Sequence, residues 1–223
     1  VLSETNPDLL FSPHFNVPLF TSVPYVVTIH DLILHRYPNQ ASFPKQLAYR
    51  ALIWQAIRRA KSVITISQFV RGEICTRYGS SVAKKMTVIR EGVSDEYVPR
   101  SADEVDAFKN KHGIDRPFYL YVGNAKEHKN VQTLLDAYAE LKSPTHDFIL
   151  VTGGPEASTL RIPRGARFLQ GLPQEDMPSL YSAADCLLTA SLYEGYCLPV
   201  AEALACGCPV IAANRTAIPE AAH

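Results

Sequence analysis

Residues 123–130 combine a glycine, two lysines and the expected start of a helix, directly after an apolar, strand-like run. Gly123 would let the backbone turn tightly. Unpaired N–H groups at the helix N-terminus, together with Lys126 and Lys129, would suit a diphosphate. A structural interpretation fits this spacing equally well, with solvated lysines and Asn130 as the helix N-cap. The segment matches neither the P-loop pattern nor G-x-G-x-x-G.

Two acidic residues, Glu194 and Glu202, flank the expected start of another helix. Pro199 suits the first helical position, so Glu194 should lie in the preceding loop and Glu202 on the early helix. Two carboxylates directed at one cleft could accept hydrogen bonds from several sugar hydroxyls. The alternative is that Glu202 is favoured by the helix dipole and that Glu194 is an exposed loop acid.

His30 and Asp31 stand at the end of a third strand-like run. A histidine at the carboxyl edge of a parallel strand can donate a hydrogen bond to a phosphate or hydroxyl, while an aspartate can shape the following turn. A purely structural histidine is the competing interpretation. His14 and Asn16 follow the first strand-like run and have a similar position.

Short apolar runs alternate with segments of helical periodicity along the whole chain. Strands are expected at 9–12, 25–30, 62–67, 87–90, 119–122, 148–152, 167–169, 186–189 and 209–212, and helices at 43–60, 68–78, 102–112, 130–141, 174–183 and 199–206. The alternation predicts an α/β fold with buried parallel strands. The polar stretch 94–117 suggests one domain over residues 1–100 and a second over 101–223. Ligands should bind beyond the carboxyl ends of the strands.

The composition is that of an ordinary globular protein. The 223 residues carry 22 basic and 22 acidic side chains, and 47% of them are hydrophobic. The balanced charge gives no whole-molecule field that favours nucleic acid or an anionic membrane. The five cysteines lack zinc-site spacing and are typical of reduced thiols, and no apolar run is long enough to cross a bilayer. We therefore expect a cytoplasmic protein, and contact with the inner face of the membrane stays open.

Over nearly its whole length the chain resembles the retaining nucleotide-sugar glycosyltransferases of the GT-B fold, family 4. The similar segments are TIHDL at 28–32, SVITIS at 62–67, YVGN at 121–124, KN at 129–130, QGL at 170–172, LYSAAD at 180–185, the E-x7-E segment from 194 to 202, ACGCPV at 205–210 and PE at 219–220. The order and spacing of the last three segments are highly specific.

The resemblance implies two Rossmann-like domains that face a cleft, both incomplete here, with the donor held mainly by the second. Lys129 then contacts the donor diphosphate, Glu194 holds the donor sugar, Glu202 binds the ribose hydroxyls, and His30 projects towards the transferred sugar. The remaining implied donor contacts are Gly123, Asn124, Lys126, Gly171, Leu172, Gly195, Tyr196, Cys197 and Leu198.

Two positions depart from the family pattern. Asn124 stands where many relatives have arginine, so Lys126 is expected to meet the diphosphate charge instead. The segment REGVS at 90–94 stands where the family usually has Asn-Gly-Val-Asp. The family also has strands and a glycine-rich loop before the position of Val1, and further elements after His223, so we expect a partial chain or else a reduced protein with altered function.

The implied activity is transfer of a sugar from a nucleotide-diphosphate sugar to an acceptor hydroxyl, with retention at the anomeric carbon. The expected partners are this donor and a carbohydrate or lipid-linked acceptor, with no nucleic acid. No cofactor and no essential metal are expected. The alternative is an inactive fragment that binds a nucleotide or sugar, and an epimerase of the same fold has no positive support.

Overall fold

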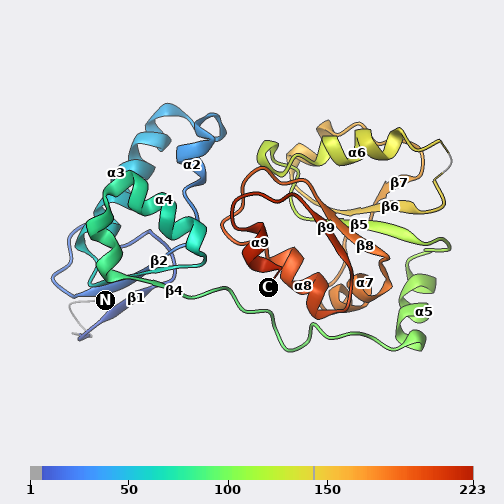
Figure 1. Ribbon diagram of the computed structural model, residues 1–223, viewed down its shortest axis with the longest axis horizontal. Coiled ribbons are helices and arrows are strands. Elements are labelled where there is room, and N and C mark those ends of the chain that lie inside the picture. The colour runs from blue at the N-terminus through green and yellow to red at the C-terminus, as the bar shows by residue number, and fades with distance from the viewer. Residues whose placement is uncertain (1–6, 143, 223) are drawn as a thin grey trace. The chain divides into compact units, whose positions relative to one another are not determined.

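The computed structural model describes residues 7–142 and 144–222, and the chain divides into two compact units, Val1–Glu91 and Gly92–His223 (Figure 1). Each unit contains one sheet whose strands are all parallel. This confirms the predicted α/β class. The sequence places the domain boundary at about residue 100, inside the irregular segment between the last strand of the first unit and the first helix of the second.

The first unit has a four-stranded sheet in the order β1-β2-β3-β4. Its strands are β1 (Leu10–Ser12), β2 (Tyr25–Ile29), β3 (Ser62–Thr65) and β4 (Met86–Val88), and its helices are α2 (Ile33–Arg36), η1 (Pro38–Gln40), α3 (Phe43–Arg59), α4 (Gln68–Tyr78) and η2 (Ser80–Lys85). The connections through α3 and α4 advance in the same direction across the sheet, so right-handed crossovers place both helices on one face (Figure 1).

The core of the first unit lies between this sheet face and the two long helices. Val27 and Val63 of the strands are fully buried, as are Ile53 of α3 and Ile74 of α4, and all belong to one hydrophobic cluster. The Ser67 hydroxyl caps α4 by accepting a hydrogen bond from the amide of Val70. The buried stripe of each helix therefore fixes which of its faces points outward.

The second unit has a five-stranded sheet in the order β7-β6-β5-β8-β9. Its strands are β5 (Phe118–Val122), β6 (Asp147–Val151), β7 (Ala166–Phe168), β8 (Cys186–Thr189) and β9 (Val210–Ala212). Its helices are α5 (Ala102–Lys111), η3 (Glu127–Lys129), α6 (Val131–Ala139), η4 (Pro155–Thr159), η5 (Gln174–Asp176), α7 (Met177–Ala183), α8 (Leu198–Ala205) and α9 (Ile218–Ala221).

This strand order is that of a doubly wound sheet. From β5 the chain runs outward through β6 and β7, then returns to the other side of β5 and continues through β8 and β9. Helix α6 lies on one face, and α7 and α8 on the other (Figure 1). The direction reverses between β5 and β8, and in open parallel sheets a ligand crevice forms at this point, beyond the carboxyl ends of the strands.

Several predicted boundaries need correction. The helix expected over 130–141 is shorter, because Asn130 has a left-handed backbone (φ 54°) that separates η3 from α6. The helix expected over 174–183 is split into η5 and α7, with Pro178 in the first turn of α7. The four-residue helices α2 and α9 were not expected, since so short a helix shows no periodicity in sequence.

Candidate active site

The site begins where β5 ends at Gly123. Its φ of 146° lies outside the range that side-chain-bearing residues readily adopt, and a Cβ there would lie 3.0 Å from the Tyr121 hydroxyl. That hydroxyl donates a hydrogen bond to the carbonyl oxygen of Asn124 (2.7 Å), which holds the turn against the strand. The predicted tight turn at Gly123 is confirmed.

The turn does not open directly into the amphipathic helix, as the sequence suggested, because η3 comes first. The Asn124 side chain shapes this detour by accepting a hydrogen bond from the amide of Lys126 (3.2 Å), and the Lys126 side chain is exposed. Asn130 occupies the N-cap position of α6, but in the described structure its side chain makes no capping bond. The side-chain amide of Asn130 donates instead to the carbonyl oxygen of Ala190 (3.3 Å), in the loop after β8.

The same two loops meet at an ion pair. Lys129 Nζ lies 2.6 Å from Glu194 Oε1, and these side chains are only 18% and 11% exposed. Beside them the amide of Leu192 donates to the carbonyl oxygen of His128 (2.8 Å). The His128 side chain is buried, which lowers its pKa to about 4, with Lys129 and Lys126 as further causes. The two loops are therefore joined by backbone and side-chain contacts, with a cation and a carboxylate between them.

Glu194 is fixed further by its backbone, since its amide donates to the Thr216 hydroxyl (3.0 Å). Three residues later Cys197 caps α8 with a left-handed backbone (φ 91°), which is unusual for a residue with a side chain. Helix α8 starts at Leu198, so Pro199 is its second residue. The prediction that Pro199 takes the first helical position was wrong by one residue. The first turn of α8 thus follows directly on the loop of Glu194, and within this turn the amide of Val200 donates to the carbonyl oxygen of Cys197 (3.0 Å).

Glu202 is held on α8 by a tyrosine. The Tyr181 hydroxyl of α7 donates to Glu202 Oε2 (2.7 Å), and Tyr181 is fully buried. Tyr97 also lies against this carboxylate: burial and then the Glu202 charge raise the pKa of Tyr97 to about 12. Gln174 Nε2 in turn donates to the Tyr97 hydroxyl (2.7 Å). Glu202 is therefore oriented by partners from outside its own helix.

A cavity of about 560 Å³ opens at the carboxyl ends of β5 and β6. The predicted residues Gly123, Gly171 and Leu172 line it together, and so does Gln174, which links the cavity through Tyr97 to Glu202. Gly171 has a φ of 67°, so the segment bends there in a way that favours glycine. The pocket borders the turn at Gly123 and is large enough for a nucleoside.

The charges of Lys129, Glu194 and Glu202 all act on the Cys197 thiol, so the three side chains lie around it. The pKa of this thiol is raised to about 12, first by burial and then by the charges of Glu194 and Glu202, while Lys129 opposes the shift. Its neighbours Gly195, Tyr196 and Leu198 complete the loop, and Tyr196 is buried. The structure thus brings Lys129, Glu194 and Glu202 together around Cys197, and Gly123, Gly171 and Leu172 around one cavity, whereas the Lys126 side chain is exposed.

His30 lies in the first unit, at the end of β2, with both ring nitrogens engaged. Nδ1 is 2.8 Å from Glu91 Oε1, and Nε2 is 2.8 Å from the carbonyl oxygen of Pro13. Because a carbonyl and a carboxylate can only accept, this arrangement favours the imidazolium, and the hydrogen bond to Glu91 is the largest cause of a raised pKa of His30. Its approach to the transferred sugar stays a prediction. Asp31 shapes the turn as expected, since its carboxylate accepts a hydrogen bond from the amide of Ile33 (2.8 Å).

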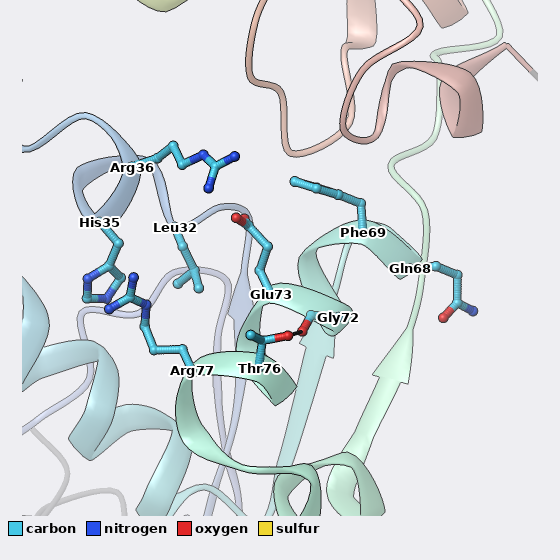
Figure 2. Close-up of a pocket in the computed structure, with 9 residues that line it drawn as sticks. All are labelled: Leu32, His35, Arg36, Gln68, Phe69, Gly72, Glu73, Thr76 and Arg77. Atoms are coloured by element: carbon cyan, nitrogen blue, oxygen red, sulfur yellow. Dashed lines mark hydrogen bonds between the residues drawn. The ribbon is translucent and has the colours of Figure 1, made fainter.

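A second cavity, of about 730 Å³, lies in the first unit between α2 and α4 (Figure 2). Arg36, Phe69 and Glu73 point into it from opposite sides. At its inner wall His35 Nε2 lies 2.9 Å from the Tyr78 hydroxyl, and burial lowers the pKa of His35 to about 4, with Arg77 and Arg50 as further causes. The first residue that lines this polar pocket, Leu32, comes two residues after His30 in the sequence.

Sequence reasoning missed several residues that position the site. Tyr97, Tyr181 and Thr216 are distant in sequence from the acids they contact, and their spacing carries no signal. Glu91 appeared only as a departure from a family pattern. Among residues 7–142 and 144–222, no group of His, Cys, Asp or Glu side chains is arranged to hold a metal ion, and no helix has the length and apolarity needed to cross a membrane.

Solved glycosyltransferases of the GT-B class share this fold. The chain matches HepE of Anabaena, solved with UDP and glucose, with a TM-score of 0.76 and 21% identity over 98% of this chain and 62% of that one. It matches the sucrose-phosphate synthase of Thermosynechococcus elongatus with a TM-score of 0.76 and 22% identity over 96% of this chain and 58% of that one. At this identity the likeness shows the fold alone, and that fold is the predicted one.

The family itself is given by the sequence. The model of the family described as "Glycosyl transferases group 1" matches residues 103–223, and the model described as "Glycosyltransferase Family 4" matches residues 1–97. The chain belongs to the glycosyl transferases group 1 family.

Curated relatives agree with this assignment. O-antigen chain mannosyltransferase B of Escherichia coli is 31% identical over 87% of this chain and 54% of that protein. The O-antigen chain mannosyltransferase RfbU of Salmonella typhimurium is 27% identical over 94% of this chain and 57% of that protein. The chain thus spans little more than half the length of these relatives.

Proposed function

We propose that this protein transfers a sugar from a nucleotide-diphosphate sugar to an acceptor hydroxyl, with retention at the anomeric carbon. The observation that carries the proposal is the pair of Lys129 and Glu194, 2.6 Å apart at the switch point of a doubly wound sheet. A cation for the diphosphate and a carboxylate for sugar hydroxyls are thereby held side by side. Solved HepE with UDP-glucose supports a donor of this kind.

The chemistry needs stabilisation of the leaving diphosphate. Lys129 is a donor fixed before reaction, the positive end of the α8 dipole lies beside its partner loop, and one such fixed donor contributes about 3 kcal/mol to a transition state. We assign the sugar hydroxyls to Glu194, the ribose hydroxyls to Glu202 and the base to the cavity at Gly171 and Leu172. Attack then occurs on the face from which the phosphate departs, without an enzymic nucleophile.

We place the acceptor on the first unit. The cavity between α2 and α4 offers Arg36, Glu73 and Arg77 to a polar acceptor. We assign to His30 a hydrogen bond to a sugar hydroxyl, which would replace its bond to the carbonyl oxygen of Pro13. The curated relatives named as O-antigen mannosyltransferases support a carbohydrate or lipid-linked acceptor. We further propose that the protein acts in the cytoplasm and needs no metal, so that transfer should survive a chelator.

Calorimetry with nucleoside diphosphates, paired with a transfer assay, tests the proposal. Lys129→Ala and Glu194→Ala should each reduce transfer by roughly a hundredfold, the equivalent of one lost donor, while far-UV circular dichroism stays unchanged. Lys109→Ala and Glu140→Ala are matched controls away from the loops. Turnover at the wild-type level in both site variants would end the assignment. Binding without any turnover in the wild-type chain would indicate a nucleotide-binding module instead.

A further inference from the structure

The two units carry opposite charge, although the whole chain is neutral. Residues 1–91 contain 11 Lys and Arg against 5 Asp and Glu, and residues 92–223 contain 11 against 17. The asymmetry is strongest in one stretch. Between Leu32 and Gly72 there are 7 Lys and Arg and no acidic residue. A basic surplus of this density, confined to one part of a chain, is typical of a surface that meets an anionic partner.

The centre of this basic stretch is helix α3, which has two apolar stripes. The inner stripe contains Tyr49, Ile53, Ala56 and Ile57, all buried in the core of the first unit. Their spacing of i, i+4, i+7 and i+8 accounts for the packing of α3 on the sheet. A helix that packs on one sheet needs only this stripe.

The outer stripe is exposed and consists of large apolar and basic residues. Phe43, Leu47 and Trp54 are 75%, 62% and 49% exposed, and Arg50 and Arg58 complete the stripe at i+7 and i+15 from Phe43. Arg58 lies over the Trp54 ring, 4.9 Å from its centroid. Residues in such a register share one side of a helix, so the apolar side chains and the guanidinium groups project together.

We propose that the outer face of α3 docks the protein onto an anionic lipid surface. Helices that lie in a membrane interface bury Trp, Phe and Leu side chains to a depth of about 5–10 Å and direct Lys and Arg at the headgroups. Phe43, Leu47 and Trp54 supply the first group, and Arg50 and Arg58 the second. No acidic residue lies between Leu32 and Gly72 in the sequence, so α3 itself carries no charge that repels anionic headgroups.

The charges and apolar side chains on the outer face of α3 favour an anionic lipid surface over a second copy of the chain or a nucleic acid. A second copy docked face to face would bring the same basic surface against itself, which is repulsive. A nucleic acid would be attracted by the arginines, but solvent-exposed Phe43 and Leu47 contribute nothing to phosphate contacts. An anionic bilayer satisfies both the charges and the apolar side chains. The inference concerns attachment alone and does not depend on sugar transfer.

The experiment uses Trp54, which is the single tryptophan of the chain. The wild-type chain should bind vesicles of phosphatidylcholine with phosphatidylglycerol, and Trp54 emission should shift to shorter wavelength and be quenched by brominated lipids. Vesicles of phosphatidylcholine alone should bind much more weakly. Raising the salt concentration should release the protein, because exposed charges are screened.

Two variants that keep Trp54 separate the contributions. Arg50→Gln with Arg58→Gln should weaken binding by about fivefold for each lost cation. Phe43→Ser with Leu47→Ser should weaken it by roughly tenfold or more, because less apolar surface is buried. Leu141→Ser, at an exposed site of the second unit, is the matched control and should bind like the wild type. Circular dichroism verifies that each variant is folded.

Four outcomes would overturn the proposal. These are no vesicle binding by the wild type, equal binding to neutral vesicles, binding without quenching of Trp54, and binding that the Phe43→Ser, Leu47→Ser variant leaves unchanged. Self-association that shifts Trp54 emission without lipid would assign the face to a second copy. Tighter binding to single-stranded RNA than to the vesicles would assign it to a nucleic acid.

Discussion

The ion pair of Lys129 and Glu194 allows a stability prediction that is independent of any assay of transfer. The pair joins the loop after β5 to the loop after β8, and both side chains are less than one fifth exposed. Among the contacts of the described residues, Lys129 is the partner of the Glu194 carboxylate. Lys129→Met would therefore leave a charged and largely buried carboxylate without its cation.

The magnitude follows from this burial. Removal of one partner from a fully buried ion pair costs about 3–5 kcal/mol, because the remaining charge stays desolvated. The partial exposure of Lys129 and Glu194 lets water compensate some of this, so we expect Lys129→Met to cost about 2 kcal/mol. Glu194→Gln should cost about as much. The double variant has neither charge and should lose about 1 kcal/mol, which gives a coupling free energy of about 3 kcal/mol.

Urea unfolding followed by far-UV circular dichroism measures these free energies. At a slope of about 2 kcal/mol per molar urea, each single variant should lower the midpoint of the second unit by about 1 M. Trp54 fluorescence follows the first unit separately and identifies its transition. The exposed pair of Arg161 and Asp136 provides a control cycle, in which Arg161→Met and Asp136→Asn should show no measurable coupling. Additive effects at Lys129 and Glu194 would refute the reasoning.

Three further predictions concern neighbouring groups. Tyr181→Phe removes a hydrogen bond to Glu202 and should raise the KM for the donor about tenfold with little change in kcat. Glu91→Gln should lower the pKa of His30 towards 6.5, measured by NMR. In the wild type this pair stabilises the fold below pH 6.5, and the stabilisation fades as the pH rises through the raised pKa; an unchanged titration in the variant would contradict this. Gly123→Ala should destabilise the second unit by about 1–2 kcal/mol in the same urea experiment, and wild-type stability would count against strain at φ 146°.

The sequence predicted the fold well, because buried parallel strands and amphipathic helices leave local patterns. In the part of the chain that the structure describes, each of the nine strands lies where an apolar run was found, with no end displaced by more than two residues. Some errors concern helices too short to show periodicity, and others fall where backbone geometry is set by a distant contact. Asn130 is an example, since its bond to Ala190 accompanies a left-handed backbone that no local pattern indicates.

The sequence by itself determined the chemical types at the site and the edge of the sheet where they stand. Lysine, carboxylate and glycine next to strand ends are local features, and parallel strands bring their carboxyl ends to one edge. Only the tertiary structure decided the pairings. The order β7-β6-β5-β8-β9 places the loops after β5 and β8 next to each other, so Lys129 meets Glu194 across 65 residues of chain, and α7 places Tyr181 on Glu202. Such contacts depend on how elements pack, and packing depends on shape and volume summed over the whole core, which spacing along the chain does not encode.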